Sequence, residues 1–458
     1  MRRVGRSAAS GMVGTARGPV RFGAVLAGAV LATACAWAAW QPDSAPDKGG
    51  LPHATATAAQ PTPTTESPGV GDKWGPWTNG TQLRGANLWQ RIVVPALDGP
   101  EFLGDGYVGP PVTQADFEAL AALGANVVDL SHPGLFTERP PYVLDEQVQA
   151  NLDRLIDMAE QADLFVVITF RTGPGRSDFT FYRDGAGDWF DADLLVESVW
   201  TDAAAQDAWV DMWRYTAERY RDNPVVVGYD LMCEPNGEGI FLDVYDPELF
   251  YPEHAGSLLD WNQFFPRIVE GIRQVDDETP VLVSAQGWGA VRWLPALEPI
   301  DAPRVVYTVH QYEPQETYTH QGPEGAHAYP GEFDITYDGE PDRFDRDWLE
   351  GMLSPVTTFQ ETHGLPVSVN EFGAERWVPD AATFMDDQMG LFEELGMNHM
   401  LWAWDPAWEP WTSSSNGFNF LFGPDPANAM PVDNELLDVI KSYWERNTIR
   451  PSTFAAPD

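Results

Sequence analysis

Two glutamates stand at the ends of apolar segments that have the length of buried strands. Glu234 follows the segment 226–232, and Pro235 ends this predicted strand because proline cannot donate to a strand ladder. Glu371 lies near the end of a second short strand predicted at 367–373. Two carboxylates at strand ends can face one substrate bond, which is the arrangement that cleaves glycosidic bonds. The alternative is that each is a buried acid paired with an arginine for structural reasons.

The strands that would position these glutamates alternate with helices along the chain. The predicted strands are 83–88, 126–130, 164–170, 226–232, 281–284, 305–311, 367–373 and 399–404. The predicted helices are 113–123, 144–162, a long helix that carries Trp209, Met212, Trp213 and Tyr220, and then 258–275, 347–363, 381–394 and 434–444. This alternation predicts an α/β fold of the (β/α)8 (TIM) barrel type. A doubly wound open sheet is the alternative, but no Gly-rich phosphate-binding turn follows the first strand.

Long connections follow several of the predicted strands. They are 88–112, 171–200, 235–257, 312–345 and 405–433, and they are rich in Trp, Tyr, Phe, Asp and His. Loops of this length in a compact domain usually carry function. Because the loops that follow the strands form the catalytic face of a (β/α)8 barrel, we expect the site at this end.

The composition narrows the classes of ligand. The formal net charge of −42 argues against nucleic acid and anionic membrane surfaces as partners. The 19 tryptophans suit a carbohydrate ligand, because the apolar faces of sugar rings stack on indole. The alternative for most of these tryptophans is a place in a large core.

The first 72 residues differ from the rest of the chain. Several arginines precede an uncharged apolar run at 22–40, so residues 1–40 are predicted to be an export signal or an uncleaved membrane anchor. Cys35 stands in an imperfect lipoprotein signal. The Pro- and Thr-rich segment 41–72 is predicted to be a linker, and 73–458 the catalytic domain. We therefore expect an exported protein, extracellular or at the cell surface, and without an internal disulfide because Cys233 is the only other cysteine.

Four short motifs together resemble a known family. They are Cys233-Glu-Pro235, His310-Gln-Tyr312, Asn370-Glu-Phe-Gly373 and Trp402-Ala-Trp404, at the fourth, sixth, seventh and eighth predicted strands. From about residue 80 to 445 the chain resembles glycoside hydrolase family 5, a cellulase-like family of retaining (β/α)8-barrel glycosidases. Thr319-His-Gln-Gly322 also looks like a segment of bacterial glucanase-like and glucosidase-like members.

The resemblance implies a retaining glycosidase that needs no cofactor or metal and acts on a β-linked carbohydrate. Glu234 would be the acid/base and Glu371 the nucleophile. Tyr312 would hydrogen-bond Glu371, and His310 would lie near Glu234 or the sugar. Trp402 and Trp404 share one face of the predicted strand 399–404, and one of the two would form the floor under the reacting sugar. Flanking subsites would come from Trp288, Trp408 and Trp411.

Two positions depart from the family pattern. Cys233 replaces the usual Asn before the acid/base, and a thiol is a weak hydrogen-bonding group. Asp129 stands where an Arg is usual, and Arg171 is expected to supply that charge by contacting Glu371 or Asp129. These departures leave room for a non-catalytic or transglycosylating relative. A metal-dependent hydrolase is a further alternative, but no metal-ligand pair stands at the end of the first strand.

Overall fold

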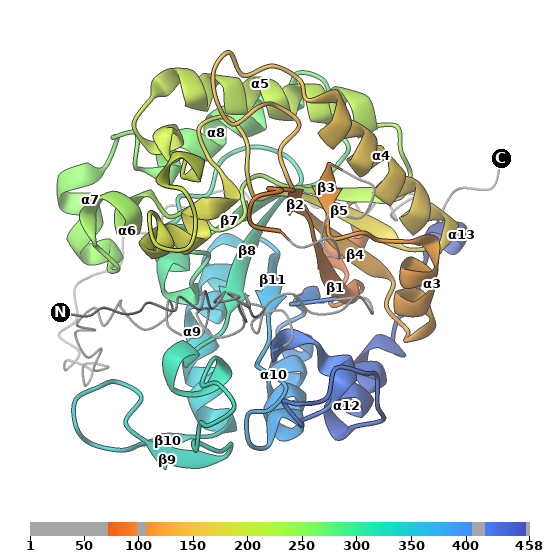
Figure 1. The fold of residues 1–458 in the computed structure, drawn as a ribbon, viewed down its shortest axis with the longest axis vertical. Coiled ribbons are helices and arrows are strands. Elements are labelled where there is room, and N and C mark those ends of the chain that lie inside the picture. The colour runs from red at the N-terminus through yellow and green to blue at the C-terminus, as the bar shows by residue number, and fades with distance from the viewer. Residues whose placement is uncertain (1–71, 99–106, 405–416, 455–458) are drawn as a thin grey trace, which may run out of the picture. The chain divides into compact units, whose positions relative to one another are not determined.

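The computed structural model describes residues 72–98, 107–404 and 417–454, and they form a closed barrel of eight parallel strands (Figure 1). The strand order around the barrel is β1-β12-β11-β8-β7-β6-β5-β4. The barrel strands are β1 (Arg84–Trp89), β4 (Val127–His132), β5 (Phe165–Phe170), β6 (Val226–Asp230), β7 (Val281–Ser284), β8 (Val305–Gln311), β11 (Val367–Phe372) and β12 (His399–Leu401). The predicted (β/α)8 fold is therefore confirmed.

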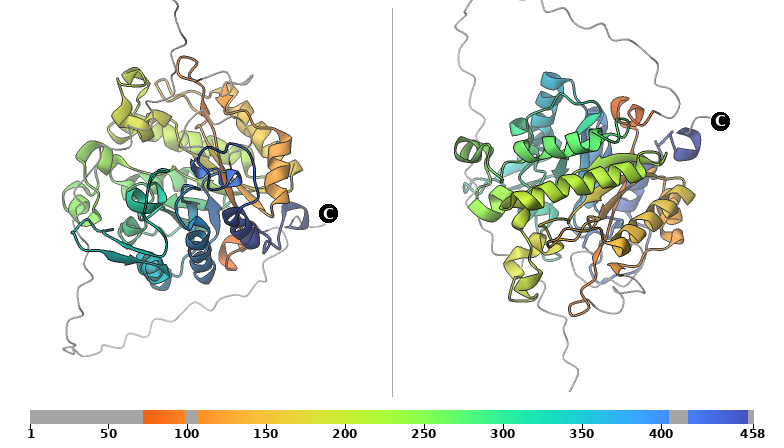
Figure 2. Two further views of the ribbon diagram at one scale, coloured as in Figure 1. Left: turned by 60° about the horizontal axis from the view of Figure 1, so that its bottom comes forward. Right: turned by 90° about the horizontal axis from the view of Figure 1, so that it is seen from above.

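Helices cover the outside of the barrel, and α5 and α8 lie side by side there (Figure 2). The long helices are α3 (Gln114–Ala122), α4 (Glu146–Gln161), α5 (Ala203–Tyr220), α8 (Trp261–Arg273), α9 (Arg346–His363), α10 (Ala381–Glu394) and α12 (Glu435–Trp444). Aspartates cap several of them, as Asp145 does by accepting from the first-turn amides of α4. The alternation of strands and α-helices is interrupted at one place, because the connection between β7 and β8 contains only a 3-10 helix (Val291–Ala296).

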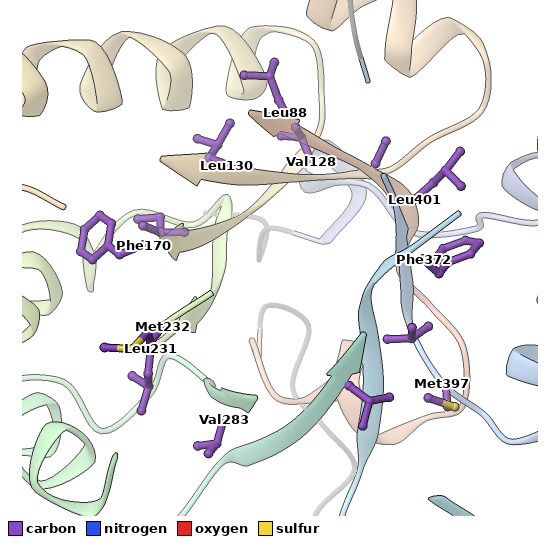
Figure 3. Packing of buried hydrophobic residues seen from close by; sticks show 14 of the residues in the cluster. Leu88, Val128, Leu130, Phe170, Leu231, Met232, Val283, Phe372, Met397 and Leu401 are labelled. Carbon is purple, nitrogen blue, oxygen red and sulfur yellow. The ribbon is translucent and has the colours of Figure 1, made fainter. Parts of the chain in front are cut away.

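The main hydrophobic core lies between the strands and the surrounding helices. Leu88, Leu130, Phe170 and Leu401 are buried members of this core, contributed by four different barrel strands (Figure 3). Trp209 of α5 is buried in the same core and donates from its indole nitrogen to the carbonyl oxygen of Leu231, just after β6. The tryptophan stripe of this helix is therefore core, because its polar edge is satisfied by the barrel backbone.

A second, smaller core fills the barrel interior at the end where the strands begin. Trp77 of the short helix α1 (Gly75–Thr78) lies in it with Val127, Phe165 and Leu282. The indole nitrogen of Trp77 donates to the Val227 carbonyl oxygen at 2.9 Å. Because this end is filled with apolar side chains, the inward-facing polar residues lie toward the carboxyl ends of the strands, where the active sites of such barrels are found.

A β-bulge in β11 determines where Glu371 points. The register with β8 shifts between Val369 and Glu371, so Asn370 is an extra residue on the bulged strand. Asn370 faces the barrel interior, where its amide donates to Asp230 at 2.7 Å. Without the bulge, the alternation of side chains would direct Glu371 outward into the helix layer. With it, two successive side chains face inward.

The connections that follow the barrel strands contain short elements of their own. They are the hairpin of β2 (Arg91–Ile92) and β3 (Val108–Gly109), the helices α6 (Gly237–Leu242) and α7 (Pro247–His254), and the hairpin of β9 (Gly331–Phe333) and β10 (Asp342–Phe344). The last described helix is α13 (Pro451–Phe454). These elements were not predicted, because each is too short to show a hydrophobic period.

Some sequence predictions fall outside the described residues. The predicted export segment and all but the last residue of the predicted linker 41–72 lie there, as do Trp408 and Trp411. Within the described ranges, no helix combines the length and the apolar character that a membrane span requires. Export therefore stays a prediction.

Candidate active site

The two strand-end glutamates meet at the carboxyl end of the barrel. Glu234 follows β6 with a left-handed backbone, at φ 53°, and Glu371 lies in β11 just after the bulge. One carboxylate oxygen of each and a ring nitrogen of His310 all lie within 4.8 Å of one another. The side chain of Glu234 is 16% exposed and that of Glu371 6%. The pair therefore faces one small volume, with Glu234 more accessible to solvent.

Glu371 accepts hydrogen bonds from its neighbours. The Tyr312 hydroxyl donates to Oε2 at 3.1 Å, and the Cys233 thiol donates to Oε1 at 3.4 Å. Burial raises the pKa of Glu371, and the charge of Glu234 raises it further, while the charges of His310 and Arg171 and the hydrogen bond from Cys233 favour the ionised form. The expected contact between Tyr312 and Glu371 is confirmed.

Arg171 lies beside Glu371 and not beside Asp129. Its Nη1 is 3.8 Å from Glu371 Oε1, and its Nε donates to Asp178 at 3.2 Å. The ring of Phe181 lies 4.0 Å from the guanidinium carbon and covers its face. Of the two partners proposed from the sequence, Arg171 thus contacts the glutamate, and Asp178 shares its charge.

His310 bridges the two glutamates. Its Nδ1 is 3.0 Å from Glu234 Oε1 and 3.6 Å from Glu371 Oε2. Burial by itself would lower the pKa of His310, but the charges of Glu371 and Glu234 raise it to about 9. The ring is therefore an imidazolium at neutral pH. These three side chains have the donor atoms of a cation site, but the two glutamates favour the protonated ring, which must lose its proton before it can bind a metal.

The two tryptophans after β12 have different environments. The strand ends at Leu401, so Trp402 and Trp404 do not share a strand face as the predicted strand 399–404 required. Trp402 is partly exposed, and its ring lies 5.3 Å from the guanidinium carbon of Arg171. Trp404 is only 4% exposed and packs against Phe420. The structure therefore leaves Trp402 as the tryptophan at the open face.

Trp288 lies on the side of the site formed by the loop after β6. Its backbone amide donates to the Pro235 carbonyl oxygen at 3.1 Å, which ties it to the residue after Glu234. Its ring stacks on Tyr245, with centroids 5.7 Å apart and planes inclined by 20°. A half-buried aromatic pair beside the acid/base candidate fits the predicted flanking subsite.

Asp129 forms part of a polar layer beneath the glutamates that the sequence did not reveal. It accepts from the Thr169 hydroxyl at 2.5 Å, and burial and the nearby Asp230 hold its pKa well above the ordinary range. Burial also raises the pKa of Asp230 to about 7. Both effects favour the protonated, uncharged form of Asp129, and this form lessens the repulsion between the acid that replaces the family's Arg and the ionised Glu371.

Other residues of the site lie in loops and were also missed. Phe181 and Asp178 come from a 3-10 helix after β5 (Asp178–Gly185), within a connection already noted for its aromatic and acidic content. His320 lies against the ring of Tyr312, at a centroid distance of 5.2 Å, and burial lowers its pKa to about 4. Its segment 319–322 had been noted, but nothing local in the sequence indicated these contacts.

Cys233 lies beneath the open face of the site. It is fully buried, and its thiol contacts Glu371 and, at 3.6 Å, Arg171. We expect Cys233→Ala to raise the pKa of Glu371, because a hydrogen bond to the ionised form lowers it. The acid limb of the kcat/KM profile should move to higher pH, whereas Cys233→Ser, which keeps a donor, should move it less. An unchanged acid limb in the alanine variant would show that the thiol only packs.

The fold and this set of side chains define a barrel with a paired-carboxylate centre, as in glycosidases. Residues 78–407 match the family model described as cellulase (glycosyl hydrolase family 5). The chain belongs to this family and is a glycosidase.

Relatives and solved structures agree with this placement. Endoglucanase C of Acetivibrio thermocellus is 22% identical over 317 residues, which is 64% of this chain and 83% of that protein. The crystal structure of endoglucanase Cel5A from Thermotoga maritima matches 81% of this chain and 99% of its own, with 18% identity and a TM-score of 0.56. A structure of the same enzyme in complex with cellobiose matches 81% and 100%, with 17% identity and a TM-score of 0.56.

Proposed function

We propose that the protein hydrolyses a β-linked glycan by double displacement with retention of configuration. The observation that carries this proposal is the separation of Glu234 and Glu371, of which one oxygen each lies within 4.8 Å of the other. Retaining glycosidases place their carboxyl groups about 5–5.5 Å apart, whereas inverting enzymes leave about 6.5–9.5 Å for a water molecule.

The environments of the two glutamates divide the roles. Glu371 is the more buried and accepts hydrogen bonds from Tyr312 and Cys233, which suits a carboxylate that attacks the anomeric carbon. Glu234 is the more exposed and borders the flanking Trp288, which suits an acid that protonates a departing sugar. In the second step Glu234 would remove a proton from a water molecule, and this water would attack the anomeric carbon and release the sugar from Glu371.

We propose a β-1,4-linked glucan or a cello-oligosaccharide as the substrate. Trp402, half-exposed beside Arg171, offers a face for the reacting sugar, and the Trp288–Tyr245 pair offers a face for a neighbouring one. The names of the relatives and the cellobiose complex favour glucose units. The acidic surface is compatible with an uncharged glycan.

Two experiments test this proposal: one determines the anomeric configuration of the product, and the other traps the glycosyl–enzyme intermediate. Proton NMR of the first product formed from an aryl β-cellobioside should show the β-anomer. A 2-deoxy-2-fluoro cellobioside with a good leaving group should inactivate the enzyme and add one glycosyl unit to the peptide that contains Glu371. An α-product, or a label on a different residue, would refute the mechanism.

A further inference from the structure

One buried arginine holds the backbone on both sides of Glu234. Arg176 Nη1 donates to the carbonyl oxygen of Cys233 at 2.6 Å, and its Nη2 donates to the carbonyl oxygen of Glu234 at 2.8 Å. These two oxygens belong to the two peptide planes that flank the Cα atom of Glu234. A single planar guanidinium therefore restrains both backbone dihedral angles at this residue.

The backbone conformation held in this way is unfavourable in itself. Glu234 has φ 53°, in the left-handed region that residues with a side chain adopt only at a free-energy cost. The following Pro235 favours an extended backbone at this position instead. Because the direction of the Cα–Cβ bond follows from these angles, a relaxed backbone would carry the carboxylate away from His310 and Glu371.

Arg176 is kept as a buried cation without a carboxylate partner among the described residues. It is fully buried, and burial lowers its pKa to about 10. The ring of Phe181 covers it, 4.9 Å from the guanidinium carbon, and the same ring covers Arg171. A backbone turn holds the main chain of Arg176 in place, because the amides of Gly173 and Arg176 each donate to the other residue's carbonyl oxygen at 2.9 Å. Such a cation is costly to bury, and its hydrogen bonds to the two carbonyls are its main compensation.

We propose that Arg176 is a positioning residue for the general acid. Its two donors keep the backbone of Glu234 in the conformation that aims the carboxyl group at the leaving-group oxygen. The proposal rests on the acid/base role of Glu234 proposed above. A misplaced acid slows only those reactions whose leaving group needs a proton. Variants of Arg176 should therefore lose kcat/KM in proportion to how poor the leaving group is, and not equally for all substrates.

The experiment measures kcat/KM for aryl β-cellobiosides whose phenols differ in acidity. Arg176→Met keeps an unbranched apolar stem in place of the arginine but removes every donor. We expect it to lower kcat/KM for the poorest leaving group about 100-fold, the scale of a misplaced catalytic group, and to change that for the 2,4-dinitrophenyl substrate little. Arg176→Lys, which keeps the charge and can bond one carbonyl at a time, should fall between. In a Glu234→Ala background, Arg176→Met should not steepen the dependence further.

A matched control is Arg273→Met. Arg273 also donates to backbone carbonyls, those of Asp276, Thr279 and Pro303, but at the opposite end of the barrel. It should lower the melting temperature and leave the leaving-group dependence as in the wild type.

The outcomes separate the two proposals. An equal loss for all leaving groups in Arg176→Met, beside a steep dependence in Glu234→Ala, would overturn the role of Arg176 alone. A Glu234→Ala enzyme without any such dependence would overturn the acid/base assignment itself. If Arg176→Met does not fold, Arg176→Lys decides: a steeper dependence supports positioning, and an unchanged one refutes it.

Discussion

Replacing Glu371 by alanine is expected to lower kcat about 10⁶-fold, the scale of losing a covalent nucleophile. The reason is that, among the described residues, the acids beneath it are not expected to take its place. Asp129 and Asp230 lie beneath it, and burial raises the pKa of both. Sodium azide should restore part of the activity, because the methyl group of alanine leaves room for a small anion beside Tyr312. The azide would attack from the face that Glu371 occupied, so the product should be the α-glycosyl azide, which NMR can identify.

A neighbouring buried acid provides the control for this variant. Glu375 lies four residues further along the chain and accepts from the indole nitrogen of Trp377 at 2.9 Å. Glu375→Gln removes a negative charge but keeps an acceptor, so its activity should stay close to that of the wild type. If Glu371→Ala kept more than about one hundredth of the wild-type kcat, the loss would fall short of the expected scale and Glu371 would not be the nucleophile.

Replacing Glu234 by alanine is expected to give a loss that depends on the substrate. For cello-oligosaccharides and other poor leaving groups, kcat/KM should fall about 10²- to 10⁴-fold, the range for general acid catalysis. For 2,4-dinitrophenyl β-cellobioside it should change little, because that phenolate leaves without a proton.

Azide also distinguishes this variant from the nucleophile variant. In Glu234→Ala the glycosyl–enzyme forms on Glu371, and azide would then release it as the β-glycosyl azide, the opposite anomer to that from Glu371→Ala. The matched control is Glu313→Gln, at a half-buried acid after β8 that the mechanism does not use. An α-azide from Glu234→Ala, or equal losses for all leaving groups, would show that the two roles are assigned wrongly.

Much of the fold follows from local sequence. Each barrel strand is a short apolar run with turn residues at its end, and each long helix has an apolar stripe and a polar cap, so both could be recognised one segment at a time. Alternation of the two then implies a parallel barrel, and the barrel implies which loops share a face. For the same reason Glu234, His310 and Tyr312 could be placed at that face from their positions at strand ends.

What the sequence could not determine depends on pairings between distant segments. The bulge that turns Glu371 inward is a property of the register between β11 and β8, which no single strand encodes. The choice of Trp402 over Trp404 depends on where β12 stops and on Phe420, which reaches the barrel from a later segment.

The partners of the charged residues were decided in the same way. Both Arg171 and Arg176 lie in the connection 171–200, whose path the sequence does not determine. Only the folded loop directs one to Glu371 and the other to the backbone of Glu234. An arginine has a long, flexible side chain, so its guanidinium can reach many acceptors. Once it is buried, it can bond only to the acceptors of the elements packed around it. The sequence by itself therefore determined which strand-end residues gather at the end of the barrel, and the tertiary structure decided which of them touch and which loop residues join them.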